Sequence, residues 1–299
     1  MRIDFSARKT FWKRHTKLAC YFTGAVDILV EEDTDDTVDR YLVNRHDETV
    51  ACFCVGKRTI YDIAYLRTQE GMQEELLEYL ITKWTELTKL VTSNETRRIR
   101  LLFPSCDREQ LERLGFQFRH QRDRLTMLLA DWEHKEVRNH SLVIRQTGIE
   151  DARQVTEIYI DAYQGTIDGQ LFSPEGLNYD DELRHMSSFL ANQSKDYPII
   201  EPASLVAISG ESEIIGFCYS CNWKGLPLIW DFAVSKKHQG KGIGKILLKE
   251  SLLKLEKEGY EQVALFVTKG NERARKLYDS LGFKADDCTL LVLEKEIQV

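Results

Sequence analysis

The chain has 299 residues, of which 42% are hydrophobic and 30% charged, and its net charge is −7. This length allows two domains, and the composition is that of an ordinary soluble protein. No apolar run reaches the ~18 residues of a membrane span, and the N-terminus lacks the apolar centre of a signal peptide, so we expect a cytoplasmic protein without a membrane partner. Since the basic residues do not gather into a stripe, nucleic acid is not an expected partner either.

From residue 141 onward the periodicity predicts a mixed α/β arrangement. Strands outnumber the helices between them, and short polar turns link the middle strands as an antiparallel meander. The predicted strands cover residues 141–146, 204–209, 213–223, 226–234, 263–267 and 289–295. The predicted helices cover residues 151–163, 180–190, a stretch that includes 246–255, and 271–281.

Cysteine usage argues against a secreted or metal-binding protein. The seven cysteines are an odd number and stand in strand-like segments, which does not suit a disulfide framework. Cys218 and Cys221 form a C-x-x-C pair, but neither a second pair nor a His-x-x-x-His follows at zinc spacing. We therefore expect free thiols and no metal, and a metal or redox role is the less favoured alternative.

Two segments of the first half resemble segments of the second half in the same order. Residues 61–66 (YDIAYL) align with residues 230–235 (WDFAVS) at an offset of 230 − 61 = 169. Residues 111–118 (LERLGFQF) align with residues 278–285 (YDSLGFKA) at an offset of 278 − 111 = 167. The ordered pair of matches predicts two related units in one chain.

The glycine-rich segment HQGKGIGKILLKE, residues 238–250, is typical of a loop that holds an anion at a helix N-terminus. A P-loop needs G-x-x-x-x-G-K-[ST], but Gly240 to Gly244 is one residue short, and Ile246 stands where a hydroxyl is required. A dinucleotide fingerprint needs G-x-G-x-x-G directly after a parallel strand, whereas this segment reads G-x-G-x-G and begins some residues later. The pattern that remains is Q-x-x-G-x-G, and a bare helix-capping turn is its structural alternative.

This pattern, Gln239, Gly242 and Gly244 after the strand DFAV, resembles motif A of the GNAT superfamily of acyl-CoA N-acyltransferases. Residues 271–283 resemble a second GNAT block, N-x-x-A-x-x-x-Y-x-x-L-G-F, in the right order and spacing. The resemblance covers residues 141–299 well. It implies an α/β fold with two GNAT-like mixed, mostly antiparallel sheets flanked by helices, one in each half.

The resemblance also implies acetyl-CoA as the co-substrate. A helix N-terminus offers unpaired N–H donors and a partial positive charge to the pyrophosphate, and glycine lets the backbone approach it. The cofactor-binding residues implied in this way are Phe232, Ala233, Val234, Gln239, Gly240, Lys241, Gly242, Ile243, Gly244, Lys245, Asn271 and Ala274.

An amine would attack the thioester directly, and the resemblance implies Tyr278 as the general acid for the leaving thiolate. The attacking ammonium must first lose a proton, and Asp231 is the nearest carboxylate in sequence, as base or amine anchor. Its counterpart Asp62 persists in the first half, which favours the alternative of a structural role. In the connection between the first two helices, Tyr163 and Asp168 are expected to bind a cationic small-molecule amine, solvated loop carboxylates being the alternative.

We therefore predict an acetyl-CoA-dependent N-acetyltransferase in residues 141–299 and a degenerate copy in residues 1–140. In the copy, Gln73 and Glu75 stand where the second half has glycines, so we expect it to bind no CoA. The roles open to it are extending the core, covering the acceptor entrance or forming a homodimer. Two rival functions are a protein N-terminal or lysine acetyltransferase, and a CoA-binding sensor or scaffold without catalysis.

Overall fold

The computed structural model describes residues 2–4, 38–45, 48–56, 63–65, 96–104, 108–132, 142–173, 176–193, 197–210, 213–223 and 225–298. The chain divides into two compact units, Met1–Arg122 with Cys288–Val299 and Asp123–Asp287. These bounds differ from the predicted domains 1–140 and 141–299, because the end of the last strand groups with the first unit.

The first unit contains a four-stranded antiparallel sheet whose strands follow one another in sequence order. Its strands are β1 (Arg2–Asp4), β2 (Val38–Arg45), β3 (Glu48–Gly56) and β4 (Ile63–Tyr65). In the same unit β5 (Thr96–Pro104) pairs antiparallel with the C-terminal part of β12 (Lys284–Gln298). Helix α3 (Arg108–Arg113) leads into β6 (Gln117–Leu128).

The two predicted L-G-F segments share one local structure. After α3, Gly115 adopts a φ of 87° and buried Phe116 leads into β6. After α8 (Glu272–Asp279), Gly282 adopts a φ of 98° and buried Phe283 leads into β12. In both, the phenylalanine N–H donates to the carbonyl oxygen five residues earlier, at 3.0 and 3.2 Å. A left-handed glycine followed by this bond is a common way to end a helix, so the two matched segments end their helices alike.

Little more of the predicted duplication falls on described residues. Ala64, which is the counterpart of Ala233, lies in β4. Asp62, Gln73 and Glu75 lie outside the described residues. The degenerate copy therefore stays a prediction.

The second unit contains five neighbouring strands of a larger sheet, in the order β11-β10-β9-β8-β7. Neighbouring strands are antiparallel except for the parallel pair β10 and β11, which confirms the predicted mixed, mostly antiparallel sheet for this unit. The strands are β7 (Val143–Gln146), β8 (Leu205–Ile208), β9 (Ile214–Trp223), β10 (Leu226–Val234) and β11 (Gln262–Thr268). All five lie within the predicted ranges or extend them by one residue.

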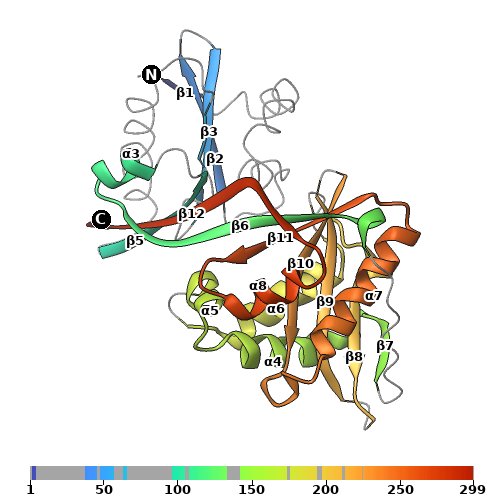
Figure 1. Ribbon diagram of the computed structural model, residues 1–299. Coiled ribbons are helices and arrows are strands. Elements are labelled where there is room, and N and C mark those ends of the chain that lie inside the picture. The colour runs from blue at the N-terminus through green and yellow to red at the C-terminus, as the bar shows by residue number, and fades with distance from the viewer. Residues whose placement is uncertain are drawn as a thin grey trace. The chain divides into compact units, whose positions relative to one another are not determined.

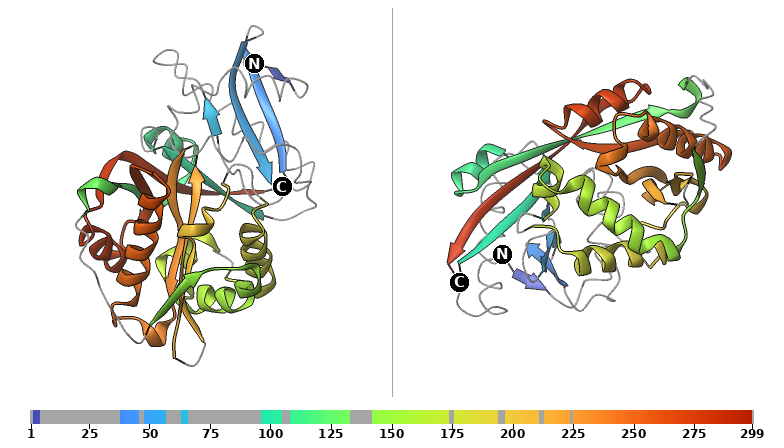
Figure 2. Two further views of the ribbon diagram at one scale, coloured as in Figure 1. Left: turned by 90° about the vertical axis from the view of Figure 1, so that its right-hand side faces the viewer. Right: turned by 90° about the horizontal axis from the view of Figure 1, so that it is seen from below.

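Helices cover both faces of this sheet, as Figures 1 and 2 show. In β9, Phe217 and Tyr219 pack toward α4 and α6, whereas Cys218 packs toward α7 and α8. A strand buried on both faces reads as a continuous apolar run, which is why GFCYSCNW shows no alternation. The helices are α4 (Ala152–Tyr163), α5 (Ile167–Phe172), α6 (Tyr179–Leu190), α7 (Ile243–Lys257) and α8.

Helix α5 lies where the sequence predicts only a polar loop. Thr166 caps it, because the Thr166 hydroxyl accepts a hydrogen bond from the Gly169 N–H at 3.1 Å. Among the helices that the structure describes, none has both the length and the apolar character of a membrane span.

Candidate active site

A β-bulge in β10 turns two consecutive side chains to the same face of the sheet. The register of β10 against β9 shifts between Ile229 and Asp231. Ile229 belongs to the core beneath α7, whereas Trp230 stacks on Phe189 of α6 with ring centroids 6.3 Å apart. Asp231 also turns to this face, where the Tyr163 hydroxyl of α4 donates to its Oδ1 at 2.8 Å. Bulges often re-aim side chains at functional sites, and here the bulge brings a carboxylate beside aromatic rings.

Beyond the bulge, β10 and β11 separate. Their parallel pairing covers Leu228 with Ala264 and Ile229 with Leu265, and it ends there. Both strands continue, β10 to Val234 and β11 to Thr268. The two strands therefore form the arms of a gap at their carboxyl ends.

The backbone of β10 presents polar groups to this gap. The Ser235 N–H donates to the Ile215 oxygen of β9 at 3.0 Å, and because backbone groups alternate along a strand, those of Phe232 and Val234 face away from β9. In the structure, side chains form hydrogen bonds with these backbone groups. The Phe232 N–H donates to Asp231 Oδ1 at 2.8 Å, and the Val234 oxygen accepts from Gln239 Nε2 at 2.7 Å.

The glycine loop lies between the end of β10 and α7. Gly240 and Gly242 have φ values of 77° and 79°, which residues with a Cβ rarely adopt. Gly242 is the N-cap of α7 and makes no side-chain capping bond, and a Cβ at either glycine would meet nothing within 4 Å. Side-chain space at both glycines is therefore open, directly before the first turn of α7. Gly244 serves packing instead, because its Cβ would lie 2.9 Å from Phe232 Cζ.

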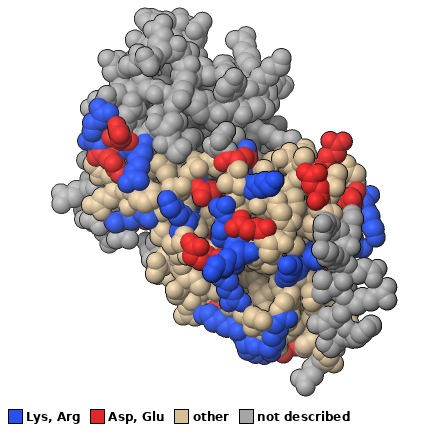
Figure 3. Space-filling model, viewed as in Figure 1, with Lys and Arg blue, Asp and Glu red and all other residues tan. Residues whose placement is uncertain are grey.

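Basic side chains surround this loop, and Figure 3 shows lysines and arginines gathered over this part of the unit. Lys241 is exposed, whereas Lys245 Nζ donates to Ser280 Oγ at the end of α8, at 3.1 Å. Arg273 of α8 donates to Gln239 Oε1. Hydrogen bonds therefore join the glycine loop and the first turn of α7 to α8.

Asn271 caps helix α8, which carries the predicted general acid Tyr278 in its last turn. Asn271 Oδ1 accepts from the Ala274 N–H at 3.0 Å. Tyr278 is 8% exposed, and its ring meets Phe283 edge-on with centroids 5.9 Å apart. Ala274 and Tyr278, four residues apart, both pack against the core on the inner face of the helix.

The Tyr163 hydroxyl is buried and faces the Asp231 carboxylate. Burial raises the pKa of Tyr163 well above its ordinary value, and the negative charge of Asp231 raises it further. Tyr163 therefore stays protonated and acts as a hydrogen-bond donor at neutral pH. Of the predicted residues, Tyr163 and Asp231 are joined by a hydrogen bond, whereas Asp168 is bonded to Thr268 and Asn271.

Comparison with known families decides the class of the second unit. The sequence model of the Acetyltransferase (GNAT) family matches residues 154–283, which include the bulge, the gap, the glycine loop and α8. The chain carries a GNAT acetyltransferase domain. The predicted resemblance is confirmed for this part of the chain.

Solved structures resemble the chain in fold. A GCN5-related N-acetyltransferase from Sphaerobacter thermophilus is 17% identical, over 91% of this chain and 85% of its own, with a TM-score of 0.68. A tandem GNAT protein from the clavulanic acid biosynthesis pathway is 13% identical, over 99% and 98%, with a TM-score of 0.70. A GNAT-family acetyltransferase from Colwellia psychrerythraea is 10% identical, over 100% of both chains, with a TM-score of 0.60. No curated protein matches the chain in sequence.

In the GNAT domain Asp168 lies at the edge of the core, 9% exposed. It accepts hydrogen bonds from the Thr268 hydroxyl at the end of β11 and from Asn271 Nδ2, the latter at 2.6 Å. Asp168 therefore faces the second arm of the gap and the cap of α8.

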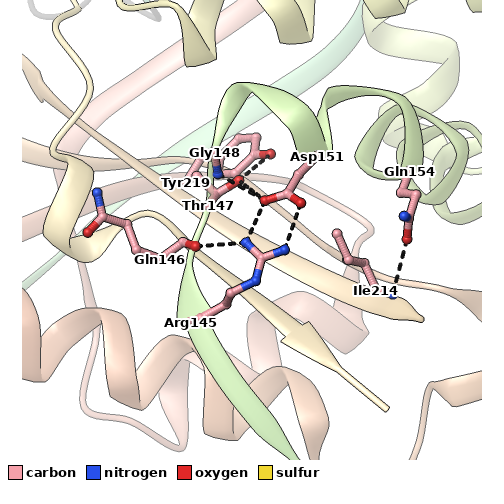
Figure 4. Close-up of polar contacts among 8 residues, drawn as sticks. All are labelled: Arg145, Gln146, Thr147, Gly148, Asp151, Gln154, Ile214 and Tyr219. Atoms are coloured by element: carbon pink, nitrogen blue, oxygen red, sulfur yellow. Dashed lines mark hydrogen bonds and ion pairs between the residues drawn. The ribbon is translucent and has the colours of Figure 1, made fainter. Parts of the chain in front are cut away.

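A second polar network of the GNAT domain, shown in Figure 4, was not predicted. Arg145 makes two bonds to Asp151, at 2.7 and 2.8 Å. Burial alone would raise the pKa of Asp151, but hydrogen bonds from Arg145 and from a backbone N–H hold it below its ordinary value. Thr147 lies between Asp151 and the buried hydroxyl of Tyr219, 3.5 Å from the latter. Since Tyr219 is opposite Asp231 in the sheet, this network supports the strand beside the site.

The C-x-x-C pair of the GNAT domain lies in β9, as predicted. Cys218 and Cys221 are buried free thiols, and burial raises the pKa of Cys218 to about 12. Within the described part of the chain, no group of three or more His, Cys, Asp or Glu side chains could hold a metal ion.

Proposed function

We propose that the GNAT domain transfers an acetyl group from acetyl-CoA to the amine of a small molecule, by direct attack of the amine on the thioester. The observation that carries this proposal is the separation of β10 and β11 beside the uncapped N-terminus of α7. A strand edge pairs with amides, and a helix N-terminus attracts anions. Together they suit a ligand with amides along its length and a pyrophosphate at its end, and coenzyme A has both.

The backbone of β10 would hold the pantetheine arm. Phe232 and Val234 would pair with its amides in place of their present bonds to Asp231 and Gln239. Such an exchange leaves no backbone group without a partner, which keeps its cost low. Ala233, 5% exposed, turns its side chain into the opposite core and serves as backbone only.

The glycine loop would hold the pyrophosphate. The N–H groups that follow Gly242 and the partial positive charge of the helix are worth about 0.3–1 kcal/mol for an exposed anion and about 2 when it is partly buried. Lys241 adds a mobile cation, and Ile243, 6% exposed, anchors the turn in the core. Asn271 and Ala274 would border the pantetheine from the α8 side.

Two groups of the chain would handle protons. Acetyl-CoA supplies a thioester whose departing thiolate has a conjugate acid of pKa ~8.5, so a proton donor assists the reaction. Tyr278 would donate that proton from the last turn of α8. Asp231 would bind the incoming ammonium and accept its proton, with Tyr163 holding the carboxylate in place.

The acceptor would lie on the α4 and α6 side of β10. There Asp231 is next to Trp230, which also packs on Tyr197 with centroids 4.8 Å apart. A carboxylate beside aromatic faces favours a cation, because both attract positive charge. This supports a small amine as the acceptor.

We also infer that residues 1–140 form a degenerate GNAT copy. The shared helix endings before β6 and β12 support this, as does the fold likeness to a tandem GNAT protein over 99% of this chain.

A thiol-release assay of the full chain tests the proposed function. Acetyl-CoA is supplied with a panel of amines, amino acids, aminoglycosides and peptides, and we expect release above background with at least one small amine. Release should fall in Asp231→Asn but not in Asp131→Asn, an exposed carboxylate used as the matched control. Thiol release at background level with every amine, together with tight CoA binding, would refute catalysis and favour a CoA-binding sensor. Release with peptides alone would refute a small-molecule acceptor.

A further inference from the structure

The end of α4 and the connection that follows it are bonded to both arms of the gap. On the β10 side, Tyr163 donates to Asp231 at 2.8 Å. On the β11 side, Asp168 accepts from Thr268 and, at 2.6 Å, from Asn271. Five positions separate Tyr163 from Asp168, so one short segment reaches from the first arm to the second.

Asp168 fixes the orientation of the Asn271 amide. A primary amide has one accepting end and one donating end. The accepting end of Asn271 takes the Ala274 N–H at 3.0 Å and caps α8, while its donating end meets Asp168 at 2.6 Å. Since a carboxylate only accepts, Asp168 admits one orientation of Asn271, and that orientation is the one that caps the helix.

The position of α8 in turn sets the second arm of the proposed cofactor site. The helix starts at Asn271 and spans only Glu272–Asp279, so few intrahelical bonds hold it and its cap contributes a large share. Its inner face carries Tyr278. A displaced cap would therefore move both the border of the pantetheine channel and the proton donor.

We propose that Asp168 is a positioning residue, which orients Asn271 and thereby places α8 for coenzyme A binding. It acts through Asn271 and touches no substrate. This role replaces the expectation that Asp168 binds the amine, and it rests on the proposed function because it concerns the same site. It also explains why a carboxylate is 9% exposed in a segment of polar, surface-like sequence.

An exchange of donor and acceptor tests the proposal. In Asn271→Asp two carboxylates face each other, and neither can donate to the other. In the double variant Asp168→Asn, Asn271→Asp the two groups exchange roles, and the new carboxylate can still accept from the Ala274 N–H. The exchange keeps the volume of both side chains, so packing is matched in both variants.

The readout is the dissociation constant for CoA, measured by calorimetry on the full chain. We expect Asn271→Asp to weaken binding about 5- to 100-fold, the range for a mispaired buried group, and the double variant to bind within about threefold of wild type. Glu157→Gln, an exposed carboxylate on α4, should leave binding unchanged. If Asn271→Asp does not fold, Asp168→Leu replaces it, because leucine accepts no hydrogen bond from Asn271.

The outcomes separate the two proposals. Equal CoA binding by wild type and by a folded single variant would overturn the positioning role and leave the proposed function standing. The same holds if the double variant folds but binds as weakly as the single one. A wild-type chain that binds no CoA would overturn the proposed function, and the positioning role with it.

Discussion

Replacing Tyr163 with phenylalanine removes one hydroxyl and leaves the ring. The ring packs on Tyr159 with centroids 4.5 Å apart and on Phe172 at 6.4 Å, and phenylalanine keeps both contacts. What is lost is the donor to Asp231 Oδ1, a bond of 2.8 Å in a partly buried place. The variant therefore isolates one hydrogen bond to a carboxylate.

The magnitude follows from the charge on the acceptor. A hydrogen bond to a charged group contributes about 1.5–3 kcal/mol, and 1.4 kcal/mol is a factor of ten. If Asp231 binds and deprotonates the amine, kcat/KM for the amine should fall about 10- to 100-fold. The KM for acetyl-CoA should stay within about threefold, because the bond lies on the acceptor side of β10. Each kcal/mol lost also lowers the melting temperature by about 2–4 °C, so rates are compared well below the transition.

The assay is thiol release at varied amine and saturating acetyl-CoA, then at varied acetyl-CoA. Tyr179→Phe is the matched control, because Tyr179 is 39% exposed at the start of α6. An unchanged kcat/KM in a folded Tyr163→Phe variant would refute the role of the Tyr163 bond. A loss confined to the KM for acetyl-CoA would place Tyr163 on the cofactor side instead.

Three further variants test other parts of the site. Tyr278→Phe should lower turnover about 10- to 1000-fold and leave CoA affinity nearly unchanged in calorimetry, and equal turnover would remove Tyr278 from the mechanism. Gly244→Ala places a Cβ 2.9 Å from Phe232 Cζ and should cost about 1–3 kcal/mol in urea unfolding, most of which Phe232→Leu should restore if that contact is the cause. The pKa of Asp151 is lower in the folded chain than its ordinary 3.8, so stability present above about pH 4 is lost as the pH falls through the folded pKa. Asp151→Asn should flatten this part of the stability curve, and an unchanged slope would argue against the Arg145 pair as its source.

Features set by local spacing could be predicted from the sequence. The apolar run of residues 226–234 and the glycines after it mark β10 and the start of α7 without reference to the rest of the chain. Asn271 at the start of α8 is equally local, because a cap bonds to the N–H three residues on. These signals fix where the cofactor loop and the candidate acid lie in the chain.

The contacts that build the acceptor side depend on residues far apart in sequence. Tyr163 and Asp231 are 68 positions apart, and Asp168 and Asn271 are 103 apart. The bulge at Trp230 leaves no signal in a run of apolar residues, because only the partner strand reveals a shift of register. The sequence therefore predicted Tyr163 and Asp168 as amine-binding residues without revealing their bonds to Asp231, Thr268 and Asn271.

The two arms of the gap have different roles in the proposed site, and residues 163–168 are bonded to both. The β10 arm must offer its backbone to one ligand and the Asp231 carboxylate to another, which the bulge permits by turning Asp231 away from the core beneath α7. The β11 arm must hold α8 at a fixed distance, and the bonds from Thr268 and Asn271 to Asp168 supply that constraint. Because Tyr163 and Asp168 belong to one short segment, any ligand that moves it changes both arms. Binding of amine and of CoA should for that reason be coupled, and by linkage each must alter the affinity of the other by the same factor.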